Sequence, residues 1–120
     1  MTGSLTTHVL DIVRGRPAAN MSIALCRLKP DDSGSQCLKT IRTDTDGRTA
    51  LPLLEGDEMI VGTYELVFSV GEYFAAQQKL DASAAFLNLV PVRFYIADPD
   101  TRYHVPLLVS PWAYSTYRGS

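Results

Sequence analysis

The sequence is short of net charge and of long apolar runs, and each shortage excludes a class of protein. Its 11 basic and 13 acidic residues leave a formal charge of −2 over 120 residues. That balance lacks the basic face that nucleic-acid binding demands, so we expect no nucleic-acid partner. The apolar runs fall far short of a bilayer span, and no basic and apolar leader opens the chain. We therefore expect a cytoplasmic protein that has no membrane partner.

The chain is also poor in cysteine and lacks the common catalytic signatures. Cys26 and Cys37 flank a turn, and without a Cys-x-x-Cys spacing they form no redox motif. We interpret both as reduced strand residues, with a disulfide between neighbouring strands as the alternative. The sequence holds no nucleophile elbow, no phosphate-binding loop and no dinucleotide fingerprint. Its two histidines lie too far apart in sequence for a compact zinc-ligand set, so we expect neither a metal nor an organic cofactor.

Short alternating runs separated by turn residues fill most of the chain, which is typical of an all-β protein. In the first run, His8 lies on one face while Thr7 and Val9 lie on the other. Between 73 and 79 the apolar spacing changes to that of a short helix. Seven or eight strands and one helix in a single domain, residues 1–120, fit a sandwich of two sheets. The pattern predicts strands at residues 5–13, 22–28, 36–43, 51–54, 62–70, 88–97, 102–110 and 112–117.

Two histidines and an arginine are the side chains best suited to catalysis. His8 lies early in the first expected strand, and His104 lies early in the next-to-last one. A histidine in a strand is usually structural, but both have polar neighbours, and an imidazole exchanges protons near neutral pH. Arg48 leaves a tight turn formed by Asp46 and Gly47. An imidazole that takes a proton from water, and a guanidinium that holds developing negative charge, form a hydrolytic site without a serine nucleophile.

The tail of the chain has an unusual composition for a terminus. Tyr117, Arg118, Gly119 and Ser120 directly follow the last expected strand. The guanidinium supplies a planar fork of donors, serine supplies a hydroxyl, and glycine allows the backbone to approach closely. A solvated tail is the usual role of such a segment. The alternative is that these four residues complete a site.

Six segments together resemble the 5-hydroxyisourate hydrolases, the transthyretin-related enzymes of urate breakdown. The resemblance extends over nearly the whole chain, and the terminal YRGS joined to the two histidine segments is its most specific part. DGR alone is a weak signal. The segments are LTTHVLD at 5–11, DGR at 46–48, GTYEL at 62–66, VPVRF at 90–94, YHVPLL at 103–108 and YRGS at 117–120.

The resemblance implies a transthyretin-like β-sandwich of two four-stranded sheets with one short helix. It also implies a homotetramer, a dimer of dimers, with active sites between the dimers at the ends of a central channel. The implied substrate is 5-hydroxyisourate, whose ring amide is hydrolysed to an open-chain ureido-imidazoline carboxylate. The implied catalytic residues are His8, Arg48, His104 and Ser120, and the implied substrate-binding residues are His8, Arg48, Tyr117, Arg118 and Gly119.

Within that implied site we expect His104 to activate the water, although the order of the two histidines stays open. His8 then orients the water or protonates the leaving nitrogen, and Arg48 binds the substrate oxygens. The alternative function is a transthyretin-like carrier, which binds a small apolar ligand without chemistry. Carriers of that kind lack the polar set of two histidines, arginine and YRGS tail, so the sequence favours the enzyme.

Overall fold

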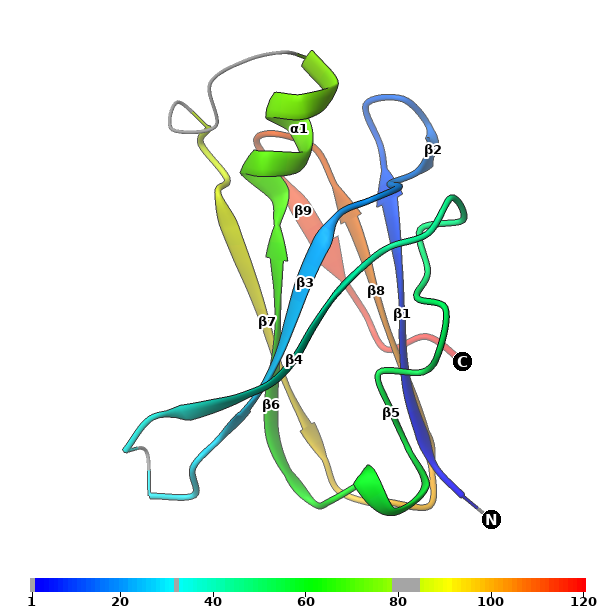
Figure 1. The fold of residues 1–120 in the computed structure, drawn as a ribbon, viewed down its shortest axis with the longest axis vertical. Coiled ribbons are helices and arrows are strands. Elements are labelled where there is room, and N and C mark those ends of the chain that lie inside the picture. Colours follow the sequence, from blue (N-terminus) through cyan, green and yellow to red (C-terminus); the bar gives the residue numbers. More distant parts are fainter. Residues whose placement is uncertain (1, 32, 79–84) are drawn as a thin grey trace.

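The chain folds into two β-sheets that pack face to face, with one short α-helix at one end of the sandwich (Figure 1). The computed structural model describes residues 2–31, 33–78 and 85–120. The 3-10 helix η1 (Gly56–Glu58) precedes β6, and the helix α1 (Val70–Gln78) follows it. The first sheet contains β1 (Ser4–Asp11), β2 (Arg16–Pro17), β5 (Leu54–Glu55), β8 (Arg102–Val109) and β9 (Tyr114–Thr116). The second contains β3 (Ser22–Leu28), β4 (Ser35–Arg42), β6 (Gly62–Ser69) and β7 (Leu89–Ile96).

Strand pairing in the first sheet brings the two histidine segments together. The strand order is β2-β1-β8-β9. The short β5 also pairs with β1, at its N-terminal end, whereas β2 pairs with its C-terminal end. β1 and β8 run parallel, whereas the other strand pairs of the described residues are antiparallel. In this parallel register Thr6 lies opposite His104, and His8 lies opposite Pro106. Segments from opposite ends of the sequence are therefore neighbours in the sheet.

Alternation along the strands directs one face of each sheet into a shared apolar core. On β1, Leu5 and Val9 are fully buried, whereas Thr6 and His8 are half-buried on the outer face. Burial of each large apolar side chain contributes about 1.5 to 3 kcal/mol, so the core supports the histidine-bearing sheet from behind. The largest fully buried side chains are Tyr64, Phe68, Leu5, Met21, Ile23, Leu25, Leu53, Leu66, Ile96, Leu107, Val9 and Val70.

The predicted all-β sandwich with one short helix is confirmed, with differences in the first sheet. The strand predicted at 22–28 has those bounds in the structure. The first sheet has five strands where the resemblance implied four, because the short β2 and β5 both pair with β1. The segment predicted at 51–54 contributes only its last residue, Leu54, to β5. Pro52 has no N–H to donate to a strand ladder, which explains the late start.

The helix begins at Val70, earlier than the predicted start at Tyr73. Val70 is fully buried and continues the alternating burial of β6. Its apolar side chain therefore fits the strand pattern in the sequence, which hides the start of the helix. The predicted last helical residue, Lys79, lies outside the described residues.

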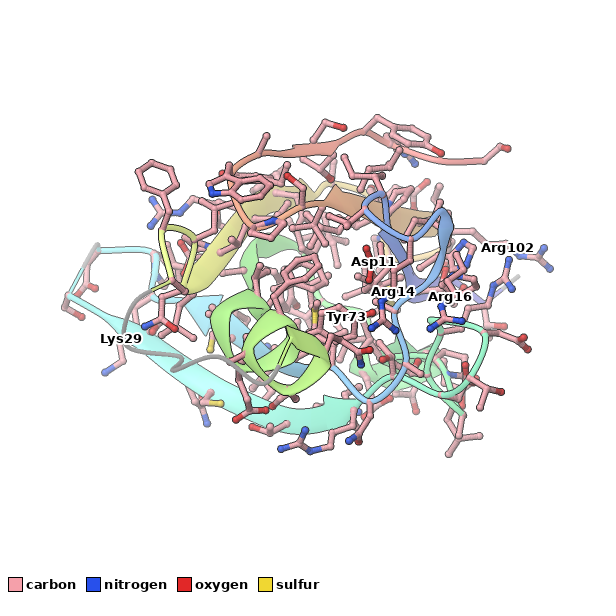
Figure 2. The ribbon with its side chains drawn as sticks, turned by 90° about the horizontal axis from the view of Figure 1, so that it is seen from above. Asp11, Arg14, Arg16, Lys29, Tyr73 and Arg102 are labelled. Carbon is pink, nitrogen blue, oxygen red and sulfur yellow. The ribbon has the colours of Figure 1, made fainter. Side chains whose placement is uncertain are left out.

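One buried polar contact ties this helix to the first sheet (Figure 2). Tyr73 donates its hydroxyl hydrogen to Oδ2 of Asp11, at the end of β1, over 2.7 Å. Oδ1 of Asp11 accepts the backbone N–H groups of Val13 at 3.0 Å and Arg14 at 3.1 Å. Burial and the bond to Asp11 raise the pKa of Tyr73, so the phenol stays protonated and remains a donor. The fully buried carboxylate is thus satisfied, and it holds α1 against the end of the sandwich.

Candidate active site

A threonine on the neighbouring strand orients His104 on the outer face of the first sheet. Thr6 and His104 are paired positions of β1 and β8, and both side chains are half-buried. The hydroxyl oxygen Oγ1 of Thr6 lies 2.8 Å from Nδ1 of His104. A hydrogen bond of this length fixes the imidazole and leaves its second nitrogen, Nε2, for another partner.

His8 lies on the same face of β1 as Thr6, because alternate residues of a strand point to one side. Its Nε2 is buried, and among the described residues it has no hydrogen-bond partner. Buried polar side-chain atoms nearly always have a partner in folded proteins. This ring nitrogen is enclosed by the protein, and His8 lines neither of the two cavities beside His104.

A tight turn at 44–48 brings Arg48 to the histidines. The Asp44 carboxylate accepts the backbone N–H groups of Asp46 at 2.9 Å and Arg48 at 3.1 Å. Gly47 has a φ of 76°, and its carbonyl accepts the N–H of Val9 at 2.8 Å. A Cβ at Gly47 would lie 2.3 Å from the Val9 carbonyl oxygen, so only glycine lets the turn lie this close to β1.

The tail of the chain is bound to β8 beside His104. Gly119 donates its N–H to the carbonyl of His104 over 2.8 Å, and a Cβ at Gly119 would lie 2.5 Å from Cδ2 of that imidazole. The Arg118 guanidinium lies 4.4 Å above the ring of Tyr103, a cation–π arrangement. It also donates to the carbonyl of Arg102 at 3.4 Å. Backbone and side-chain contacts together hold the tail against the strand that carries the histidine.

His104 lies between two adjoining cavities. One, of about 220 Å³, is lined in part by Arg48 and Thr6. The other, of about 410 Å³, is lined in part by Thr6, Arg102 and Ser120. His104 and Thr6 line both cavities, so a ligand in either one meets the imidazole. Arg48 and the hydroxyls of the smaller cavity suit a polar, anionic molecule, and the larger cavity carries both the Arg102 guanidinium and the Glu55 carboxylate.

Burial lowers the pKa of His104 below the usual value of 6.5, and the nearby His8 and Arg48 lower it further. Both effects disfavour the charged imidazolium. The ring is consequently neutral at neutral pH, and a neutral imidazole is the form that accepts a proton from water.

A family profile described as the HIUase/Transthyretin family matches residues 5–119. The chain belongs to this family. The 5-hydroxyisourate hydrolase 2 of Rhizobium meliloti (strain 1021) is 53% identical over 119 residues, which are 99% of this chain and 98% of that protein. The 5-hydroxyisourate hydrolase of Ralstonia nicotianae is 50% identical over 118 residues, 98% of this chain and 99% of that protein.

Solved structures of the family share the fold. An (S)-allantoin synthase matches with a TM-score of 0.90 and 48% identity over 99% of this chain, and this chain spans 44% of that one. The Klebsiella pneumoniae 5-hydroxyisourate hydrolase matches with a TM-score of 0.74 and 30% identity over 98% of this chain and 99% of that one. Sea bream transthyretin in complex with thyroxine matches with a TM-score of 0.81 and 25% identity, covering 97% and 94% of the two chains.

The structure brings most of the predicted site residues of this family member together. His8 and His104 share one face of the first sheet, Arg48 and Ser120 each line a cavity beside His104, and Gly119 packs on its ring. The two remaining side chains point elsewhere. Tyr117 is 59% exposed and Arg118 lies over Tyr103.

Sequence reasoning missed several side chains that line these cavities, and the polar ones nearest in chemistry to the site are Thr6, Glu55 and Arg102. Thr6 contacts His104 directly, and Glu55 and Arg102 line the larger cavity. Alternation along the first strand set His8 on the face opposite to Thr7 and Val9, but nothing in the sequence indicated the parallel pairing of β1 with β8. Glu55 lies at the larger cavity because it belongs to the short β5, and the pairing of β5 with β1 was not predicted either.

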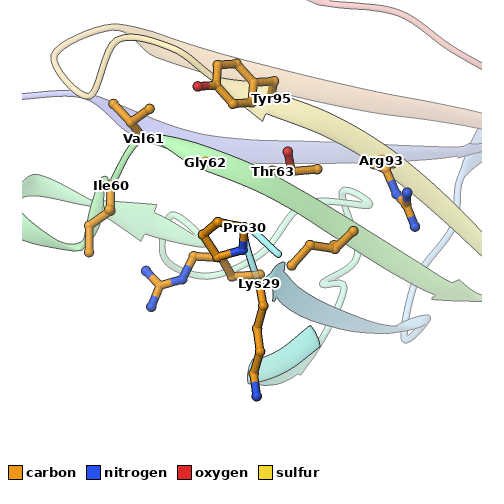
Figure 3. Close-up of a pocket in the computed structure, with 10 residues that line it drawn as sticks. Lys29, Pro30, Ile60, Val61, Gly62, Thr63, Arg93 and Tyr95 are labelled. Atoms are coloured by element: carbon orange, nitrogen blue, oxygen red, sulfur yellow. The ribbon is translucent and has the colours of Figure 1, made fainter. Parts of the chain in front are cut away.

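A larger cavity, of about 790 Å³, lies at the second sheet and contains none of the predicted site residues (Figure 3). Its walls combine apolar side chains such as Ile60 with cationic ones, but Figure 3 shows Lys29 and Arg93 extending to different places, so their charges do not converge. Within residues 2–31, 33–78 and 85–120, no three His, Cys, Asp or Glu side chains are grouped as metal ligands. No helix of that part of the chain has the length and apolar character needed to cross a membrane.

Proposed function

We propose that this member of the family is an enzyme that hydrolyses 5-hydroxyisourate. The observation that carries the proposal is the position of His104, a neutral imidazole between one cavity lined by Arg48 and another lined by Ser120. Relatives that are 53% and 50% identical over nearly the whole chain bear the name 5-hydroxyisourate hydrolase. The substrate follows from those relatives, and the roles of the residues follow from the chemistry below.

Hydrolysis of a ring amide requires an activated water and a ring nitrogen that leaves with a proton. His104 takes a proton from the water as the water oxygen bonds to the ring carbonyl carbon. The carbon–nitrogen bond of the ring then breaks, and the nitrogen receives a proton from His8 or from the protonated His104. The product is an open-chain carboxylate that has gained one molecule of water. Proton transfer by a positioned group contributes about 10²-fold to 10⁴-fold to the rate.

Charged and polar groups around the imidazole bind the substrate. The guanidinium of Arg48 holds the negative charge that develops on the carbonyl oxygen. Ser120 hydrogen-bonds the substrate from the larger cavity. Gly119 packs beside His104, and Arg118 turns from the ring of Tyr103 toward the anionic edge of the substrate while the exposed Tyr117 covers it.

The alternative function is a carrier for a small apolar ligand. One solved transthyretin with 25% identity to this chain holds thyroxine. The polar walls around His104 distinguish this chain from a carrier that binds an apolar ligand, because unpaired polar groups weaken the binding of such a ligand.

We further propose that the working form is a homotetramer, a dimer of dimers. β7 and β9 each end the strand order of a sheet, so each has one edge without a partner among the described strands. Exposed edges invite pairing with another chain. Tyr114 on β9 and the neighbouring Trp112 are 44% and 71% exposed, and aromatic side chains are enriched in interfaces.

The test is the decay of the ultraviolet absorbance of 5-hydroxyisourate freshly generated by urate oxidase, followed with and without the protein. Decay that accelerates in proportion to protein concentration supports the hydrolase. Decay at the spontaneous rate, together with tight binding of thyroxine by folded protein, would favour the carrier. The mechanism with two histidines fails in one specific case, in which His8→Ala keeps full activity while His104→Ala loses it.

A further inference from the structure

The imidazole of His104 is held at two opposite edges of its ring. On one edge, Nδ1 lies 2.8 Å from Oγ1 of Thr6 on β1. On the other edge, Cδ2 lies so close to Gly119 that an added Cβ would approach it to 2.5 Å. The ring therefore has little freedom to rotate, and its remaining nitrogen, Nε2, is the ring atom next to Cδ2 and takes no part in the contact with Thr6.

A contact with Nδ1 decides which nitrogen of a neutral imidazole carries the proton. A threonine hydroxyl can donate or accept, so the pair has two possible arrangements. When Oγ1 of Thr6 accepts the Nδ1 proton, Nε2 keeps a lone pair, and that nitrogen can take a proton from water. When Oγ1 donates to Nδ1, Nε2 carries a proton and cannot act as a base. Activity as a base at Nε2 requires the first arrangement.

We propose that Thr6 is a positioning residue of the hydrolase, which accepts the Nδ1 proton of His104 and thereby presents Nε2 as the base. Gly119 assists by fixing the ring from its other edge. This inference rests on the proposed function, because a base is needed only if the site activates water. It adds a role for a side chain that lines both cavities beside His104.

The charges around His104 make the choice of tautomer matter. Burial, His8 and Arg48 lower the pKa of His104, so the neutral ring, which alone has two tautomers, prevails at neutral pH. Acceptance of the Nδ1 proton by Thr6 works in the opposite direction, because the hydroxyl oxygen also stabilises the imidazolium. The titratable and charged groups that face the ring or line its cavities are His8 on β1, Arg48 in the turn, Glu55 on β5 and Arg102 on β8.

The variants Thr6→Val and Thr6→Ser separate a positioning role from a merely structural one. Valine has the shape of threonine without the hydroxyl, and serine restores the hydroxyl. The control is Thr116→Val, which removes a bond of 2.7 Å from Oγ1 of Thr116 to the carbonyl of Pro106, also on β8. That control loses a threonine bond to the same strand without a change at the imidazole.

We expect Thr6→Val to lower kcat about 10-fold to 100-fold with little change in KM, because loss of an orienting partner acts on the base and not on binding. The acidic limb of the kcat/KM profile, measured between about pH 5 and about pH 9, moves to lower pH because the imidazolium loses an acceptor. Thr6→Ser recovers most of kcat. Thr116→Val keeps the wild-type kcat and acidic limb while its melting temperature falls.

Nitrogen-15 NMR of histidine in the substrate-free protein reports the tautomer without any turnover. We expect the proton of neutral His104 on Nδ1 in the wild type and a mixture of tautomers in Thr6→Val. A proton on Nε2 in the wild type, or a Thr6→Val kcat within about twofold of wild type, would overturn the inference. Absence of hydrolase activity in a wild type that carries the Nδ1 proton would instead reject the proposed function and leave the tautomer assignment standing.

Discussion

Among the individual side chains, His104 has the surroundings that a base needs near neutral pH. Burial, His8 and Arg48 keep its imidazole neutral, while Thr6 and Gly119 hold the ring in one orientation. A neutral, oriented imidazole is competent to take a proton from water. The Arg48 guanidinium that lowers its pKa also attracts an anionic substrate, so one charge serves both purposes.

Substitution of Arg48 by glutamine should raise the pKa of His104 toward 6.5. The change removes a positive charge that disfavours the imidazolium, so protonation becomes easier. NMR titration of the His104 ring protons in the substrate-free protein measures the effect directly. Arg27→Gln, at the second sheet, is the control and should leave the titration unchanged. Equal His104 pKa values in wild type and Arg48→Gln would show that Arg48 does not act on the imidazole.

Among the strands and turns, the segment at 44–48 does most to assemble the site, because it carries Arg48 from the second sheet to β1. Its close approach depends on the positive φ of Gly47 and on the bond from Val9 to the Gly47 carbonyl. The sequence predicted a tight turn at Asp46 and Gly47, and the structure has that turn, with Gly47 in the left-handed region. What the sequence did not reveal is that the turn lies against His8.

Gly47→Ala should lower the free energy of unfolding by about 3 kcal/mol or more, because it adds a clash with the Val9 carbonyl to the cost of a positive φ. Gly15→Ala is the matched control. Gly15 also has a positive φ, 69°, but nothing lies within 4 Å of an added Cβ. The control should lose only about 1 to 2 kcal/mol. Urea unfolding of both variants tests the difference, and equal losses would refute the tight packing of the turn on β1.

Tyr73→Phe should lower the free energy of unfolding by about 1.5 to 3 kcal/mol, because it removes a hydrogen bond to the buried carboxylate of Asp11. The control, Tyr95→Phe, removes a hydroxyl from a side chain that is 57% exposed, and its stability should stay within about 0.5 kcal/mol of wild type. Urea unfolding again provides the measurement. A Tyr73→Phe value as small as that of the control would mean that the contact does not anchor the helix.

Local patterns predicted most of the strands, but not how the strands pair. Alternation placed His8 on one face and Thr7 and Val9 on the other, and the structure shows that the face with Thr7 and Val9 is the buried one. The parallel pairing of β1 with β8 depends on contacts between the ends of the chain, which no local period encodes. For that reason the two histidines were found as motifs, whereas the role of Thr6 emerged only from the structure.

For the molecule as a whole, the sandwich provides a rigid support whose outer face carries the site, while edge strands such as β7 and β9 are open to other chains. Neither cavity beside His104 is large, at about 220 Å³ and 410 Å³, and both open onto the outer face of the sheet. A second subunit packed on that face would enclose the substrate and exclude water from the reacting atoms. The proposed tetramer thus has a catalytic reason as well as a structural one.

Sedimentation equilibrium should give a mass four times that of one chain for the wild type. Tyr114→Lys should give a smaller assembly, because it places a charge on the open edge strand β9. Val61→Lys changes a side chain of similar exposure, 48% against 44%, in the segment before β6 and not on β9, and should leave the tetramer intact. A wild type that sediments as a single chain would rule out the tetramer.

The most direct measurement is the rate of 5-hydroxyisourate decay with wild type and with His104→Ala, both shown by circular dichroism to be folded. The hydrolase mechanism predicts that wild type accelerates the decay and that His104→Ala loses about 10²-fold to 10⁴-fold of that acceleration. Equal acceleration by both proteins would contradict the assignment of His104 as the base. Decay at the spontaneous rate with folded wild type would contradict the hydrolase itself.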